Sequence, residues 1–102
     1  MRIAKVIGQV IATVRSQNMN MDKLCLLEFI GKDGKPTGDI HIAMDQLGAG
    51  VGEWVMVVAG SSARAAYGNG GQNNNSPVDL CVVGIIDEIR EENRQWYDKR
   101  HQ

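Results

Sequence analysis

The residues of this chain that could do chemistry are few, and they are scattered rather than gathered into a catalytic set. The two histidines, His41 and His101, stand far apart in the sequence. His41 falls on the polar side of an alternating segment, where a solvated or interface histidine is expected before a general base. Ser61, Ser62 and Arg64 form a polar segment, but no Asp–His pair is near enough in sequence to indicate a catalytic triad. The pattern does not favour a nucleophilic enzyme.

Three alternating glycines, Gly48, Gly50 and Gly52, precede Glu53 and invite comparison with a phosphate-binding loop. A P-loop carries a Lys-Ser/Thr pair after its glycines and leads into a helix whose N-terminus faces the phosphate. The sequence has no such pair, and no helix is expected to follow. Glycines also supply positive φ angles and let backbones approach closely, within a fold or between subunits. We expect a single helical turn at residues 45–47 and then a tight loop.

Two carboxylates, Asp79 and Asp87, lie within or beside the apolar stretch at residues 78–89. A buried carboxylate is costly unless it is hydrogen-bonded or paired with a positive charge. Two explanations stay open for this pair. Each carboxylate has a backbone or turn partner within its own subunit, or it meets a cation across an interface, with Arg64 and Arg2 as the candidates.

Length and composition restrict the class of protein. The 102 residues allow one domain and one core, which Val, Ile, Leu, Met and Ala must fill because only 5% of the residues are aromatic. A formal net charge of -1 does not supply the basic footprint of a nucleic-acid-binding protein. No window approaches the roughly 20 apolar residues of a membrane-spanning helix. We expect a cytoplasmic chain with neither nucleic acid nor membrane as its partner.

The two cysteines, Cys25 and Cys81, each lie inside an apolar run, and neither belongs to a CxxC pair or a Cys/His cluster. We expect free, buried thiols that behave as small hydrophobic side chains. A disulfide or a reactive thiol is the alternative. With no metal-binding spacing present, we expect no cofactor.

Alternation of apolar and polar residues predicts an all-β chain. The expected strands cover residues 3–14, 24–30, 38–44, 53–59 and 78–89. Gly8 indicates a bulge in the first strand, and Ile40, Ile42 and Met44 share one side of the third. Turn residues fill 31–36, a short loop is expected at 60–64, and the Gly/Asn-rich segment from Tyr67 to Pro77 is expected not to pack. Five strands without an internal helix predict a small OB-like antiparallel barrel.

The chain ends in a charged tail, residues 90–102, that carries Trp96 and Tyr97. Burying an aromatic side chain removes roughly 150–250 Å² of surface from water. A domain this small offers these two aromatics no evident site, so we expect them to be buried on a neighbouring copy of the chain. This divides the sequence into a barrel, residues 1–89, and a tail, residues 90–102, that contacts a neighbouring subunit.

Several segments together resemble the EutN/CcmL family, the vertex proteins of bacterial microcompartments. In chain order the matching segments are residues 1–10, 47–55, 60–64, and 77–79 leading to 85–87. The tail, with Glu92-Asn93-Arg94 followed by Tyr97-Asp98-Lys99-Arg100, is most similar to the carboxysomal branch. The Gly/Asn-rich residues 68–75 match no motif of the family.

This resemblance implies a non-enzymatic homopentamer that closes the shell of a carboxysome at its vertices and meets hexameric shell proteins. It also implies a narrow axial pore and a C-terminal segment that reaches a neighbour. The residues expected at subunit contacts or near the pore are Gly48, Gly50, Glu53, Ser61, Ser62, Arg64, Asp79, Asp87, Trp96 and Tyr97.

Two other classes of protein stay open. An OB-type module that binds single-stranded nucleic acid would need a basic groove and aromatic stacking platforms, and the sequence is poor in both. A small enzyme with a site between chains would need a catalytic constellation, and none is visible.

Overall fold

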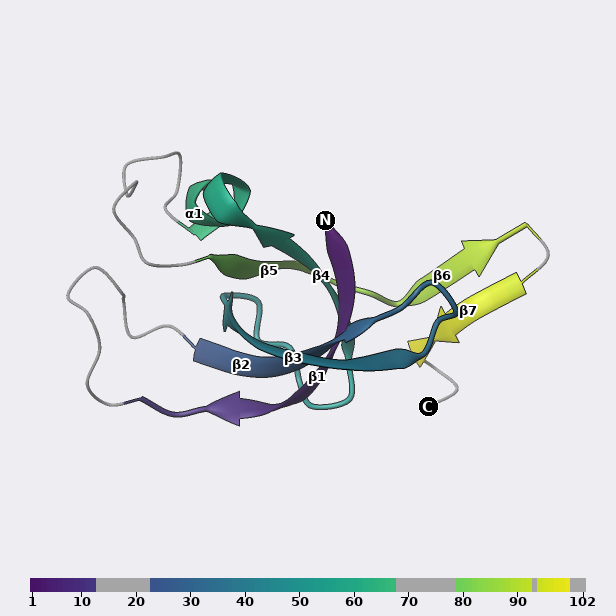
Figure 1. Cartoon of the computed structure of the whole chain (residues 1–102), viewed down its shortest axis with the longest axis horizontal. Coiled ribbons are helices and arrows are strands. Elements are labelled where there is room, and N and C mark those ends of the chain that lie inside the picture. Colours follow the sequence, from purple (N-terminus) through teal and green to yellow (C-terminus); the bar gives the residue numbers. More distant parts are fainter. Residues whose placement is uncertain (13–22, 68–78, 93, 100–102) are drawn as a thin grey trace.

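The computed structural model describes residues 1–12, 23–67, 79–92 and 94–99, with the backbone alone described at 64–67. The elements, in chain order, are β1 (Arg2–Val10), β2 (Lys23–Ile30), β3 (Pro36–Asp45), β4 (Trp54–Ala59), α1 (Gly60–Tyr67), β5 (Leu80–Ile85), β6 (Glu88–Glu91) and β7 (Arg94–Asp98). Five of these strands form a barrel, and the last two form a separate hairpin (Figure 1).

The barrel is closed in the order β1-β2-β3-β5-β4, which confirms the predicted all-β, OB-like fold. Four of its pairings are antiparallel, and one, between β3 and β5, is parallel at Met44↔Cys81 and Asp45↔Val82. A parallel pair needs a crossover connection. Here β4 and α1 lie within that connection, so the short helix belongs to the path that closes the barrel.

The bulge predicted at Gly8 is present in β1. Val6 pairs with Leu27, but Gly8 pairs with Leu26, so the register shifts between these two positions. A bulge bends its strand and increases the local twist. β1 pairs with β4 only before the bend, over residues 2–5, and with β2 on both sides of it, over residues 4–10.

Apolar side chains lie both inside the barrel and on its outer surface. The interior contains the inward residues of all five strands, Val55 and Leu27 among them. A second cluster lies outside, where Ala63 of α1 packs on Leu24, Met44 and Cys81. A third cluster lies beneath the β6–β7 hairpin. Figure 1 shows α1 and the hairpin toward opposite ends of the molecule, so each covers a different part of the barrel surface.

The predicted third strand is present as β3, but its apolar side faces mostly outward. Ile40 and Ile42 are 52% and 50% exposed, whereas Ala43, on the other side, is buried in the barrel core. His41 shares the side of Ala43, and its ring centroid lies 4.7 Å from that of Phe29. Period-two alternation identified the strand correctly but did not identify which side would be buried.

The short loop expected at residues 60–64 is instead the start of α1, so the prediction of no internal helix was wrong. The run Ser61-Ser62-Ala63 reads as a polar loop, but alanines follow along the helix. An eight-residue helix is marginal in isolation and depends on tertiary packing. Ala63, which is fully buried against the barrel, supplies that packing.

Two other local predictions fail around the barrel ends. Asp45 is the last residue of β3 rather than part of a helical turn, and a bend follows at residues 46–47. The strand expected over 78–89 ends at Ile85, and the chain re-forms as β6 only at Glu88. The Gly/Asn-rich segment at 68–75 lies outside the described residues.

Both cysteines are free and buried, as the sequence predicted. Burial among apolar side chains is the main reason that the pKa of the Cys25 thiol is raised to about 11. At neutral pH this thiol therefore stays protonated. Among the described residues, no helix is long and apolar enough to cross a membrane.

Candidate assembly site

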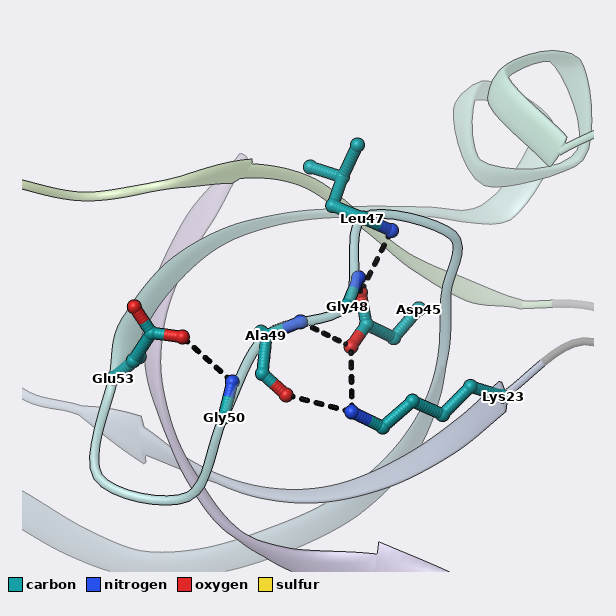
Figure 2. A network of polar contacts seen from close by, with 7 residues as sticks. All are labelled: Lys23, Asp45, Leu47, Gly48, Ala49, Gly50 and Glu53. Carbon is teal, nitrogen blue, oxygen red and sulfur yellow. Dashed lines mark hydrogen bonds and ion pairs between the residues drawn. The ribbon is translucent and has the colours of Figure 1, made fainter.

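The glycine-rich segment after β3 is shaped by one buried carboxylate, Asp45 (Figure 2). Its Oδ1 accepts the backbone N–H groups of Leu47 at 3.0 Å and Gly48 at 3.1 Å, and its Oδ2 accepts that of Ala49 at 2.8 Å. Short side-chain acceptors of this kind close turns by bonding to the backbone a few residues on. The loop therefore folds back over the end of β3 around a single side chain.

Lys23, the first residue of β2, completes this arrangement from the neighbouring strand. Its Nζ donates to the carbonyl of Ala49 at 2.9 Å and lies 3.8 Å from Asp45 Oδ2. The pairing of Lys23 with Asp45 in the β2–β3 register brings the two side chains together. A buried carboxylate needs a compensating charge or hydrogen bonds, and Asp45 has both.

The second half of the loop is held by Glu53, which the sequence singled out. Gly50 donates its N–H to Glu53 Oε1 at 2.6 Å, and Gly52 donates to the carbonyl of Val6 at 2.8 Å. Gly48 and Gly52 have φ angles of 79° and 95°, values that side-chain-bearing residues rarely adopt. Gly50 does not share that conformation. The predicted requirement for positive φ thus holds for two of the three glycines.

Glu53 also connects this loop to the C-terminal hairpin. Its Oε2 lies 2.6 Å from Nζ of Lys99, which follows β7, and the same ammonium is 4.0 Å from Asp87. The hydrogen bond from Lys99, followed by that from the Gly50 N–H, lowers the pKa of the Glu53 carboxyl below its ordinary value. The hydrogen bond to Glu53 raises the pKa of Lys99. The loop and the hairpin are therefore joined by an ion pair at neutral pH.

The hairpin itself packs on its own barrel. Tyr97 is 4% exposed, and its ring stacks on Trp54 with the ring centroids 4.5 Å apart. Trp96 is half-buried beside Gly34, and Arg94 donates to the carbonyl of Asp33 at 2.7 Å. The premise that both aromatics need a neighbouring copy is therefore wrong for Tyr97. Ile30 and Ile86 belong to the same buried cluster and complete its site.

The candidate residues fall into two groups at opposite ends of β4 and β5. Gly48, Gly50 and Glu53 precede β4, and Asp87 follows β5, so these residues lie with the hairpin at one end. Ser61, Ser62 and Arg64 belong to α1 after β4, and Asp79 precedes β5 at the other end. The carbonyl of Asp79 accepts the N–H of Gly60 at 3.0 Å, which joins the start of α1 to the start of β5.

Asp79 and Asp87 are both exposed, so the expectation that they are buried carboxylates was wrong. Each lies just beyond an end of β5 rather than inside it. Ser61 and Ser62 are exposed on the first turn of α1. These side chains are therefore available for contacts outside the subunit.

Sequence reasoning missed Asp45, Lys23 and Lys99 as organising residues. The signal for Asp45 was present, because an Asp that ends a strand and is followed by Gly three residues later is typical of a side-chain-closed turn. Lys23 and Lys99 lie 76 positions apart (99 − 23). Only the barrel register and the returning hairpin bring them to the same loop.

The described residues contain no group of three or more potential metal ligands. The aromatic side chains that a nucleic-acid-binding OB barrel would expose for stacking are mostly buried here, since Phe29, Trp54 and Tyr97 are at most 7% exposed. The site consists of a braced loop, an ion-paired hairpin and exposed polar side chains at the barrel ends. These features maintain the shape of the subunit and present polar side chains for contacts with other molecules, as expected of a structural protein.

Comparison with known proteins identifies a family of structural proteins that this chain matches. The family described as "Ethanolamine utilisation protein EutN/carboxysome" matches residues 1–87. The chain is 49% identical over 89 residues to the bacterial microcompartment shell vertex protein EutN of Salmonella typhimurium, covering 87% of this chain and 86% of that protein. It is 41% identical over 100 residues to the carboxysome shell vertex protein CcmL of Synechocystis, covering 98% and 96%.

Solved structures agree with the sequence relatives. A structure of the ethanolamine utilization protein EutN superposes with a TM-score of 0.86 at 44% identity, over 97% of this chain and 99% of that one. The pentameric microcompartment shell protein GrpN from Rhodospirillum rubrum superposes with a TM-score of 0.76 at 34% identity, over 89% and 99%. The chain belongs to the EutN/CcmL family of bacterial microcompartment shell vertex proteins, which are structural proteins and not enzymes.

Proposed function

We propose that this chain assembles into a homopentamer that occupies the vertices of a microcompartment shell and meets hexameric shell proteins there. The observation that carries the proposal is its similarity over most of its length to shell proteins described as pentameric. The physical requirement is geometric, because a flat sheet of hexagonal tiles cannot close without fivefold points. Cytoplasmic localisation within such a shell is part of the same proposal.

The solution mass of the purified protein tests the ring directly. A pentamer predicts 56 kDa, five times the 11.2 kDa of one chain, by native mass spectrometry or light scattering. A monomer would contradict the ring and would revive the single-stranded nucleic-acid-binding alternative. Binding to single-stranded DNA that weakens steeply with added salt would then identify that alternative. A hexamer would keep an assembly role and exclude the vertex.

The carboxysome is the compartment that we propose first. Its support is the reach of the sequence match, since the sequence match to CcmL covers 98% of the chain, including the tail, whereas that to EutN covers 87%, although a EutN structure superposes over 97%. The higher identity to EutN, 49% against 41%, favours a second candidate, the ethanolamine-utilisation compartment.

Replacing each relative by this chain in the relative's own host would distinguish between the two candidate compartments. The chain would be expressed in place of CcmL in a cyanobacterium and in place of EutN in a bacterium that forms the ethanolamine compartment. Closed polyhedral shells in the first host alone would support the carboxysome, and closed shells in the second host alone would contradict it. Co-purification with the hexameric shell proteins of the permissive host would test the proposed partner.

A further inference from the structure

A cavity of about 310 Å³ opens at the end of the barrel opposite Glu53, where β4 passes into α1. Residues from the start of β1, the end of β2, the middle of β3 and the start of β5 line it. They include Arg2, Phe29, His41, Gly60, Asp79 and Leu80. The mouths of β-barrels are frequent ligand sites, and small-molecule pockets begin at about 300 Å³. The hollow therefore has the position and the size of a small-molecule site.

Arg2 is held in place at this mouth. The ring of Phe29 is 2% exposed and belongs to the barrel core, so its position is fixed. The central guanidinium carbon of Arg2 lies 3.6 Å from the centroid of that ring. A guanidinium that stacks through its face keeps its N–H groups in the plane, where they form a fork that matches a carboxylate. Within the described part of the chain, no carboxylate forms an ion pair with Arg2.

His41, which also packs against the Phe29 ring, already has a partner. Its Nε2 lies 2.9 Å from Asp39 Oδ1, and its ring is tilted 48° to that of Phe29. The histidine therefore extends the aromatic wall and is satisfied at one nitrogen by its own subunit. Arg2 is the cation that this mouth offers to a ligand.

Asp79 restricts which anion fits. Asp79 is one of the residues that line the same cavity, and its negative charge disfavours a dianionic phosphate there relative to a singly charged carboxylate. The Asp79 carboxylate can accept a hydrogen bond from a donor on the ligand. A ligand that carries both a carboxylate and a nearby N–H group can therefore bind to Arg2 and to Asp79 at the same time.

We infer that the barrel mouth binds a carboxylate through the stacked Arg2 guanidinium, with Asp79 accepting an N–H of the same ligand. An N-acylated amino acid and the end of a polypeptide share this chemistry. The carboxylate can thus belong to a free small molecule or to another subunit. The inference does not require the ring, because every residue it uses lies in one chain.

N-acetylglycine is the probe, since it carries one carboxylate and one amide N–H. It would be titrated into the purified ¹⁵N-labelled full chain, and binding would be followed by shifts of the backbone amides at Arg2, His41, Gly60 and Leu80. We expect saturable shifts that are absent with N-acetylglycine amide, which lacks the carboxylate. Acetate, which lacks the N–H donor, should bind the wild type more weakly than N-acetylglycine does, whereas Asp79→Ala, which has no side-chain acceptor, should bind the two ligands equally.

The decisive variant is Arg2→Gln, with Arg90→Gln as the matched control. Arg2 and Arg90 are both exposed, and Arg90 pairs with Glu88 on the hairpin, far from the mouth in the fold. Charge-assisted hydrogen bonds of this kind correspond to at least about a tenfold change in affinity. We expect Arg2→Gln to bind N-acetylglycine at least tenfold more weakly than the wild type, and Arg90→Gln to bind it equally well. Thermal melts check that both variants fold.

The outcomes separate the two sources of the carboxylate. Loss of N-acetylglycine binding in Arg2→Gln alone supports a site for free carboxylates. If the wild type binds no free carboxylate, but Arg2→Gln dissociates at about tenfold higher protein concentration than Arg90→Gln, another subunit supplies the group. Binding and assembly that are both independent of Arg2 overturn the inference. A monomeric wild type that still binds N-acetylglycine would contradict the proposed pentamer and leave this inference standing.

Discussion

At the scale of single residues, a buried carboxylate determines the shape of the glycine-rich loop. The side chain of Asp45 is 0% exposed and accepts three backbone N–H groups. Its ion pair with Lys23 is the smaller effect, because the Lys23 side chain is 33% exposed and solvent weakens exposed charge pairs. The hydrogen bonds from the backbone, rather than the opposite charge, therefore hold the loop.

Substitutions at these two positions should separate the two effects. Asp45→Ala should lower the free energy of unfolding by about 3 kcal/mol, because it removes three charge-assisted hydrogen bonds and leaves the N–H of buried Ala49 without its acceptor. Lys23→Met should lower it by about 1 kcal/mol or less. Urea unfolding at one fixed protein concentration measures both values. A larger loss from Lys23→Met than from Asp45→Ala would contradict this assignment.

The pair of Glu53 and Lys99 predicts a dependence of stability on pH. The pKa of Glu53 is lowered in the folded chain, so its contribution is present above the ordinary value of 4.5 and is lost as the pH falls through the folded value. The pKa of Lys99 is raised, so its contribution is present below 10.5 and is lost as the pH rises through the folded value. Between these limits the ion pair is intact.

Glu53→Gln tests this dependence at the acid end. The variant keeps a side-chain acceptor for the Gly50 N–H but cannot form the ion pair with Lys99. We expect it to melt at a lower temperature than the wild type at pH 7, with the difference shrinking as the pH falls below 4.5. Melting curves from pH 3 to pH 7 measure the difference. A difference that stays constant over that range would show that the charge on Glu53 does not stabilise the fold.

At the scale of elements, local patterns predicted the barrel strands because alternation and turn residues act over short distances. Gly8 marked the bulge, and residues 31–36 marked a turn, for the same reason. α1 was missed because its first turn is polar and its stability comes from Ala63 packing on a barrel that the sequence does not display. The hairpin was missed because the apolar run continues through Ile86 and Ile89, although the chain bends at Asp87.

The residues of the candidate site divide in the same way, into those recognisable from their spacing in the sequence and those that only the fold brings together. Glu53 and the glycines were recognisable from their spacing, and Gly48 and Gly52 do have positive φ. The partners that hold them could not be predicted, since Lys23 and Lys99 arrive from distant parts of the sequence through strand register and hairpin docking. Exposure of Asp79 and Asp87 depends on where β5 begins and ends, and boundaries are the least certain part of any strand prediction.

The docking of the hairpin can be tested at Tyr97. Its ring is buried on Trp54, but within the described part of the chain its hydroxyl has no hydrogen-bond partner. Tyr97→Ala should lower the free energy of unfolding by about 3 kcal/mol through loss of packing. Tyr97→Phe should match the wild type or exceed it slightly, because it removes a buried polar group that makes no hydrogen bond. Urea unfolding followed by tryptophan fluorescence measures both variants.

Two outcomes would revise this view of the hairpin. A loss of about 1 kcal/mol or more in Tyr97→Phe would show that the hydroxyl has a partner, and a neighbouring subunit would then be the first place to look for it. Tyr97→Ala that unfolds like the wild type would show that the hairpin does not cover the barrel in solution. Removal of residues 90–102 is expected to destabilise the subunit itself, because Tyr97 packs on its own barrel.

At the scale of the whole molecule, a fivefold ring needs two different complementary faces on each subunit. A contact between identical patches pairs two chains only, whereas a ring of five uses head-to-tail contacts in which one face meets the other. The candidate residues already form two groups at opposite ends of β4 and β5. Ser62 belongs to the α1 end and Asp87 to the hairpin end, and both are exposed. We assign one end to each face of the ring.

This assignment predicts how two defective subunits complement each other. Ser62→Arg should damage one face and Asp87→Arg the other, so each variant alone should fail to form a 56 kDa ring of 11.2 kDa chains. In an equimolar mixture one intact pair of faces remains, which joins two subunits and cannot propagate further. We therefore expect a mixed dimer of about 22 kDa by native mass spectrometry, twice the mass of one chain. A single variant that keeps the ring would remove its residue from the contact. A mixture that stays monomeric would place both residues on the same face, and the two ends of the barrel would then not form the two different faces of the ring.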